Sequence, residues 1–233
     1  MFKNISKKIT NTGDVSQKQT VTALRIIFPL WSIVAMFSIL YVPGKIMVQG
    51  DEAATLSNLM TYENLFRWSI FGNLLTQVLL IFAALLLYKL FKSVDKKHSL
   101  MIVVFAFLGI PIDMVNNLNK FAALHIIHNP DVADSLAILF LNLSEQGLII
   151  ASIFWGLWLL PYGWLVYKSG YFPKFLGTLV IIAGIGYLLL VSISIIAPEQ
   201  KTLIESVNYL TMGELIFMFW LIFKGAKLPS VEN

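Results

Sequence analysis

Six apolar stretches, each long enough to cross a lipid bilayer, constrain this sequence more than any other feature. A helix needs about 20 mostly apolar residues to span the hydrocarbon core. Because no water is present there to satisfy exposed backbone groups, such stretches must be helical. They predict an all-α integral membrane bundle of six transmembrane helices, over Thr22–Val42, Trp68–Phe91, Leu100–Leu124, Leu148–Tyr167, Phe175–Ala197 and Val207–Phe223.

The composition excludes most other classes of protein. Apolar residues make up 58% of the chain and charged residues only 13%, against about 45–50% and about 25% in soluble domains. A soluble enzyme, a nucleic-acid-binding protein and a disordered chain are therefore excluded. The chain has no cysteine, which also excludes disulfides and thiolate chemistry.

The distribution of basic residues predicts the orientation in the membrane. If the N-terminus is cytoplasmic, 13 of the 17 lysines and arginines lie in cytoplasmic segments or at their borders, and Lys45, Arg67, Lys120 and Lys201 lie towards the outside. Basic residues favour the cytoplasmic side. We therefore expect a cytoplasmic tail over residues 1–21, a transmembrane domain over 22–224 and a cytoplasmic tail over 225–233.

Two segments on the predicted outer side are more than short loops. Residues 50–66 have apolar side chains at helical spacing, and Asp51 is a suitable N-cap. We expect an amphipathic helix on the outer surface there. Residues 131–144 are either a second such helix or an extension of the fourth span. Pro130 breaks whatever precedes them.

Several stretches resemble a known family of membrane proteins. They are GKIMVQGDEAAT (Gly44–Thr55), ENLFRWSI (Glu63–Ile70), IFWGLWLLPYGWLVYKSGYFPKFLG (Ile153–Gly177) and GELIFMFWLIFKG (Gly213–Gly225). In their order along the chain they resemble the bacterial membrane proteins grouped as domain of unknown function 4386. The resemblance implies a multi-pass protein of the bacterial inner membrane. That family has no established activity, so it implies no catalytic residues.

The third span carries a continuous polar face. Asp113, Asn116, Asn117 and Lys120 stand at i, i+3, i+4 and i+7, which places them on one side of a helix. Pro111 precedes them and frees a backbone carbonyl. Because a charge at bilayer depth costs roughly 2.5–3.5 kcal/mol on insertion scales, these side chains should face the bundle interior.

Polar residues of other spans extend this face into a predicted vestibule. Counting helical rise from the inner ends brings Asn73, Gln77, Asn208, Glu145 and Glu214 to the midplane or the outer half of the bundle. We expect an outward-opening cavity that binds a small polar or cationic solute, or a lipid headgroup. Asp113 and Glu214 would be the charge partners, and their protonation could drive transport. Neutralising either acid should then abolish binding.

A structural role is the alternative for this polar core. Amides and acids also hydrogen-bond across helices simply to hold them together. Lys120 can reach the headgroups on its own. The protein would then be a scaffold or an accessory subunit of a larger assembly.

Histidines suggest a different function. His125, His128, Asp131 and Asp134 follow one another at intervals of three residues on the predicted outer side. His and Asp are suitable ligands for zinc and other divalent metals, so a metal-dependent hydrolase at the outer interface is a second hypothesis. The alternative is a solvated loop that precedes a helix. No hydrolase, P-loop or dinucleotide motif is present, and no other cofactor is expected.

Overall fold

The computed structural model describes residues 2–129 and 133–228, with side chains from residue 17 onward. Within these ranges the chain is helical and has no strand. Six helical stretches are long and apolar enough to cross a membrane: Gln17–Ile46, Glu63–Phe91, Lys96–Ile127, Asp134–Ser169, Lys174–Ile196 and Lys201–Lys224. The predicted all-α bundle with six spans is therefore confirmed.

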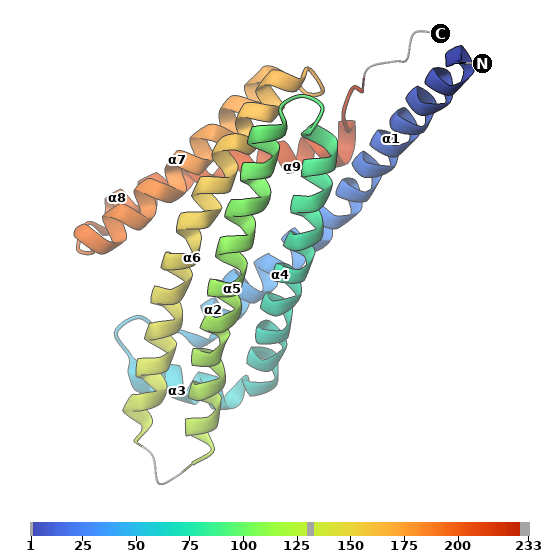
Figure 1. The fold of residues 1–233 in the computed structure, drawn as a ribbon. Helices are drawn as coiled ribbons and strands as arrows, with labels where there is room; N and C mark the ends of the chain where they lie inside the picture. The colour runs from blue at the N-terminus through green and yellow to red at the C-terminus, as the bar shows by residue number, and fades with distance from the viewer. Residues whose placement is uncertain (1, 130–132, 229–233) are drawn as a thin grey trace.

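The elements follow one another with short connections (Figure 1). They are α1 (Phe2–Ala35), a π-helical segment η1 (Met36–Tyr41), α2 (Val42–Ile46), α3 (Glu52–Thr61), α4 (Glu63–Phe91), α5 (Lys96–Ile127), α6 (Asp134–Ser169), α7 (Lys174–Ile196), α8 (Lys201–Asn208), a 3₁₀ turn η2 (Tyr209–Thr211) and α9 (Met212–Lys224).

Most helices extend beyond the apolar ranges predicted for them. Polar residues that flank an apolar range remain helical, and the helix ends where a residue such as glycine or proline stops it. The helix α1 begins at Phe2, so the predicted tail is largely helical. The segment from Asp134 extends the fourth span and forms no separate surface helix. At the other end of the chain, Gly225 ends α9 with φ of +68°. Pro130 and Asp131 lie outside the described residues.

The first span continues through Pro43, beyond the range Thr22–Val42 expected from the sequence. The helix widens into the π-helical segment η1, in which the Val42 N–H donates to the carbonyl of Phe37. Pro43 then stands in the first turn of α2. A proline lacks the N–H that a continuous helix needs at this position, and the π-helical segment just before it accommodates that loss. The span therefore continues to Ile46.

The predicted amphipathic helix is α3, although it is shorter than the predicted range. The Asp51 carboxylate accepts a hydrogen bond from the Ala54 N–H at 2.8 Å and caps the helix as expected. Leu59 is fully buried in a small apolar cluster with residues of α2, α4, α5 and α6. Thus α3 closes one end of the bundle with its apolar face inward.

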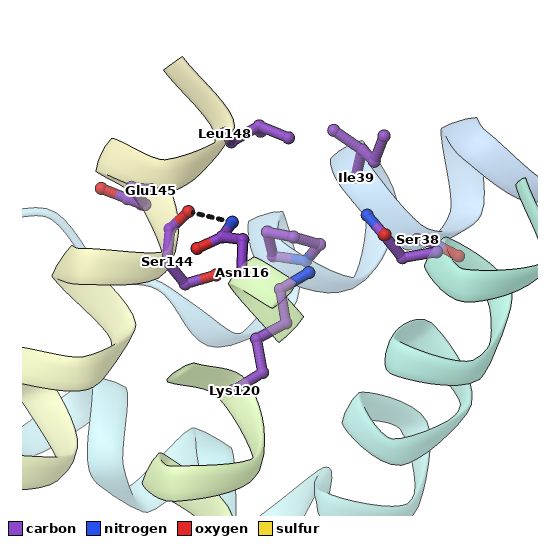
Figure 2. Close-up of a pocket in the computed structure, with 9 residues that line it drawn as sticks. Ser38, Ile39, Asn116, Lys120, Ser144, Glu145 and Leu148 are labelled. Carbon is purple, nitrogen blue, oxygen red and sulfur yellow. Dashed lines mark hydrogen bonds between the residues drawn. The ribbon is translucent and has the colours of Figure 1, made fainter. Parts of the chain in front are cut away.

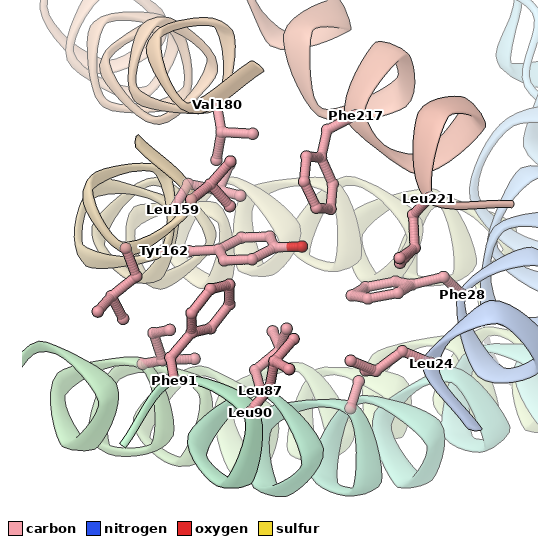
Figure 3. Packing of buried hydrophobic residues seen from close by; sticks show 14 of the residues in the cluster. Leu24, Phe28, Leu87, Leu90, Phe91, Leu159, Tyr162, Val180, Phe217 and Leu221 are labelled. Atoms are coloured by element: carbon pink, nitrogen blue, oxygen red, sulfur yellow. The ribbon is translucent and has the colours of Figure 1, made fainter. Parts of the chain in front are cut away.

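The main apolar core lies at the other end of the bundle (Figure 3). Tyr162 of α6 lies at its centre, and its ring is 5.2 Å from that of Phe217 in α9 and 6.2 Å from that of Phe91 in α4. Glycines bring α6 and α7 into close contact. A Cβ at Gly163 would lie 2.7 Å from the carbonyl oxygen of Gly177. Small residues at such contacts are typical of helix packing in membranes.

The helices divide into two groups by direction (Figure 1). The long helices α4, α5 and α6 run alongside one another, whereas α7 leans away from α6 and α9 passes behind the bundle. The turn at α8 therefore lies about midway along α5 and α6, far from α3. The start of α1 and the end of α9 lie at the same end of the molecule, as an even number of spans requires.

Candidate functional site

A buried polar network joins α4 to α5. The Gln77 amide nitrogen donates to the Asp113 carboxylate at 2.6 Å. The Asn117 amide nitrogen donates both to Asn73 Oδ1, at 3.0 Å, and to the backbone carbonyl of Asp113, at 2.8 Å. All four side chains are buried. The polar face predicted for α5 therefore meets Asn73 and Gln77 of α4.

The network leaves acceptor atoms without a partner in the protein. Asp113 Oδ1, Gln77 Oε1 and Asn117 Oδ1 are buried and accept no hydrogen bond from the described residues. Buried polar atoms without partners are rare, and they point to bound water, an ion or a functional role. The network therefore has hydrogen-bonding capacity beyond what holding two helices together requires.

A cavity of about 120 Å³ lies beside this network, on the predicted outer half of the bundle (Figure 2). Segments far apart in the sequence meet there. Its lining residues are Ser38 and Ile39 of η1, Pro43 of α2, Asn73 of α4, Asn116 and Lys120 of α5, and Ser144, Glu145 and Leu148 of α6. Asn73 belongs both to the cavity wall and to the network, so the two form one polar region.

Asn116 fixes the wall between α5 and α6. Its amide nitrogen donates to the backbone carbonyl of Ser144 at 2.8 Å, and its amide oxygen accepts from Asn119 at 3.0 Å. This crossing needs the glycine at position 147, because a Cβ there would collide with the Asn116 amide. The pair of Asn116 and Gly147 thus sets the shape of the wall.

Ser38 is the functional candidate that the sequence did not reveal. It lies in η1, it is completely buried, and its hydroxyl has no hydrogen-bond partner among the described residues. The hydroxyl also lies against Gly72 of α4, where any side chain would clash with it. π-Helical segments occur frequently at functional sites. The signal for η1 in the sequence was Pro43 within an apolar run, because a helix must adjust its hydrogen bonds near a proline.

Lys120 and Glu145 both line the cavity, but their charged groups point in different directions. Figure 2 shows the Lys120 side chain rising from α5 into the cavity, and the Glu145 carboxylate turned away from it. Lys120 is half-buried, whereas Glu145 is exposed. No carboxylate among the described residues forms a salt bridge with Lys120.

Two predicted site residues lie away from this region. Glu214 is buried at the start of α9, which packs on α7 and α1. Asn208 is exposed at the end of α8. Counting helical rise assumes spans that run parallel to one another, and the lean of α7 and α9 breaks that assumption (Figure 1). The structure therefore joins Asp113, Asn116, Asn117, Lys120, Gln77 and Asn73 in one region without Glu214.

The four predicted metal ligands are not gathered where the structure describes them. His128 Nε2 lies 3.0 Å from Oε2 of Glu63, and Arg67 contacts the other oxygen of the same carboxylate, Oε1, at 2.7 Å. His125 and Asp134 are exposed, and Asp131 lies outside the described residues. Among the residues that the structure describes, no group of three or more His, Cys, Asp or Glu side chains could hold a metal ion.

The comparisons with known proteins agree with this architecture. The model of the family described as domain of unknown function 4386 matches residues 27–225, so the chain is a member of a family of multi-pass helical membrane proteins. It belongs to the domain of unknown function 4386 family. An uncharacterised protein of Archaeoglobus fulgidus is 36% identical over 166 residues, which cover 71% of this chain and 89% of that protein. No solved structure matches.

Proposed function

We propose that this protein binds a small polar or charged group, from a solute or a lipid headgroup, in the cavity lined by Ser38, Asn73, Asn116, Lys120 and Ser144. The observation that carries this proposal is Ser38, a residue of the cavity wall whose buried hydroxyl lies against Gly72 and has no hydrogen-bond partner among the described residues. Burying a hydroxyl without a partner costs about 1–3 kcal/mol. A ligand that accepts its hydrogen bond would offset that cost.

The volume of the cavity limits the size of the bound group. At about 120 Å³ it is well below the roughly 300–1,000 Å³ of pockets that enclose a drug-sized ligand. The bound group therefore contains only a few heavy atoms, and any larger remainder of the ligand extends outside.

Asp113 supports this site without lining it. It accepts from Gln77, and its backbone carbonyl accepts from Asn117, which also donates to Asn73 in the cavity wall. We therefore assign Asp113 a positioning role and, where transport occurs, the role of proton carrier. Binding and transport on the predicted outer face of a bacterial cytoplasmic membrane are the function that we propose.

Ser38→Ala tests the proposal. Removing an unpaired hydroxyl should leave the fold intact, since no partner is orphaned. We expect native mass spectrometry of the purified wild type to detect a bound small molecule or lipid, and Ser38→Ala to bind it about tenfold more weakly. The matched control is Ser192→Ala, which removes a hydroxyl that donates to Leu188 in α7, on another part of the bundle. A wild type that retains nothing, or equal retention in Ser38→Ala, would overturn the proposal.

A further inference from the structure

We infer that the group bound in this cavity is an anion of the phosphate or carboxylate type, held by Lys120. This inference rests on the proposed function and names its ligand class. It replaces the cationic alternative considered from the sequence.

The charge in the cavity is the first observation. Among the described residues that line it, Lys120 directs an ammonium into the space, and the Glu145 carboxylate points away (Figure 2). Asp113 precedes Lys120 by seven residues, or about 10 Å along the helix axis; its carboxylate accepts from Gln77 and attracts the Lys120 ammonium electrostatically, but it forms no salt bridge with it. A cation in the cavity would therefore meet a like charge, whereas an anion would meet an ammonium that forms no salt bridge with any described residue.

The neighbouring groups are the second observation. Lys120 contributes up to three N–H donors and Ser38 contributes a hydroxyl that no protein atom uses. An anionic oxygen accepts from the ammonium, and hydrogen bonds to a charged group are shorter and stronger than those between neutral groups. An ammonium without a salt bridge near the hydrocarbon region is costly, so the anion would stabilise the site as well as occupy it.

The rim of the cavity is apolar. Ile39 of η1 and Leu148 of α6 face each other across it (Figure 2). Such a rim suits the glycerol and acyl part of an anionic phospholipid, while the same donors would also hold a free phosphate. Both sources share one chemistry, and a single titration distinguishes them.

The experiment uses the purified protein in detergent, titrated by native mass spectrometry with phosphatidylglycerol or with diacylglycerol of identical acyl chains, which lacks the phosphate. We expect the wild type to prefer phosphatidylglycerol about tenfold, as a charge-assisted hydrogen bond allows. Lys120→Met should abolish this preference, and Lys120→Arg should keep it because a guanidinium also binds phosphate. Displacement of the lipid by inorganic phosphate would identify a site for free anions, and no displacement would identify a lipid site.

Lys45→Met is the matched control. Lys45 is exposed in α2, on the same side of the predicted membrane as Lys120, with its amine 5.9 Å from the Tyr41 ring. Its loss should leave the preference for phosphatidylglycerol unchanged. If Lys120→Met impairs folding, as judged by its melting temperature, Lys120→Gln takes its place in the titration. A preference that survives the loss of the Lys120 charge, or no preference in the wild type, overturns the anion site. The cavity proposal would still be decided separately by Ser38→Ala.

Discussion

The hydrogen bond between Gln77 and Asp113 allows the structural role of a buried acid to be measured directly. Asp113→Asn keeps an oxygen that can accept from Gln77, whereas Asp113→Leu leaves the amide without its acceptor. We expect Asp113→Leu to lower the free energy of unfolding by about 1–3 kcal/mol, and Asp113→Asn to lower it much less. Reversible unfolding in mixed micelles measures both.

A double-mutant cycle with Gln77→Leu adds the coupling energy of the pair. Hydrogen bonds between membrane helices average about 0.6 kcal/mol and reach about 1.7 kcal/mol, and this short contact should fall towards the upper value. Val115→Leu on the exposed face of α5 is the control. Equal destabilisation by Asp113→Asn and Asp113→Leu would show that the charge itself, and not the hydrogen bond, stabilises the fold.

Between elements, Asp95 connects the start of α5 to the end of α6. Its carboxylate accepts from the backbone N–H groups of Lys97 and His98, at 3.1 and 3.2 Å, and from the Lys168 ammonium at 3.2 Å. The hydrogen bond from the His98 backbone N–H is the main cause that lowers the pKa of Asp95 from 3.8 to about 2. The folded state therefore favours the ionised carboxylate.

This lowered pKa predicts how stability changes in acid. A carboxyl group with a depressed pKa stabilises the fold at any pH above 3.8, and that contribution is lost as the pH falls from 3.8 to about 2. We expect Asp95→Ala to lower the melting temperature at neutral pH, with the difference from wild type disappearing near pH 2. Asp95→Asn should lie between the two, because asparagine also caps helices. A difference that persists unchanged into acid would contradict this account.

The sequence predicts the helices of this fold better than their contacts. Apolar length alone identifies all six spans, because crossing a bilayer imposes a minimum length on each. Helical spacing identifies the polar face from Asp113 to Lys120. The partners of that face depend on how the helices lean and pack, which periodicity within one helix does not encode. Only the structure therefore identifies Ser38, Ile39 and Leu148 as residues of the cavity wall. Glu214 is not part of this site, because the leaning helix α9 packs on α7 and α1.

For the whole molecule, the orientation in the membrane decides from which side of the membrane a ligand can enter the cavity. The excess of basic residues predicts that both ends of the chain and the turn between α4 and α5 are cytoplasmic. The segment containing α3, which packs on α2, α4 and α6, would then face outward. Since the chain has no cysteine, a single introduced cysteine reports its own side without background.

Labelling intact cells with a membrane-impermeant maleimide therefore tests the orientation. Ser93 in the turn between α4 and α5, Ala53 in α3 and Glu199 before α8 are all exposed. We expect Ala53→Cys to react in intact cells and Ser93→Cys to react only after the membrane is permeabilised. Glu199 lies in the turn between α7 and α8, which stands about midway along α5 and α6 (Figure 1). The reaction of Glu199→Cys with the maleimide therefore measures whether this turn is accessible from outside the cell. If Ser93→Cys is labelled in intact cells, the orientation is the reverse of the predicted one. The cavity with Lys120 would then be open to anions of the cytoplasm.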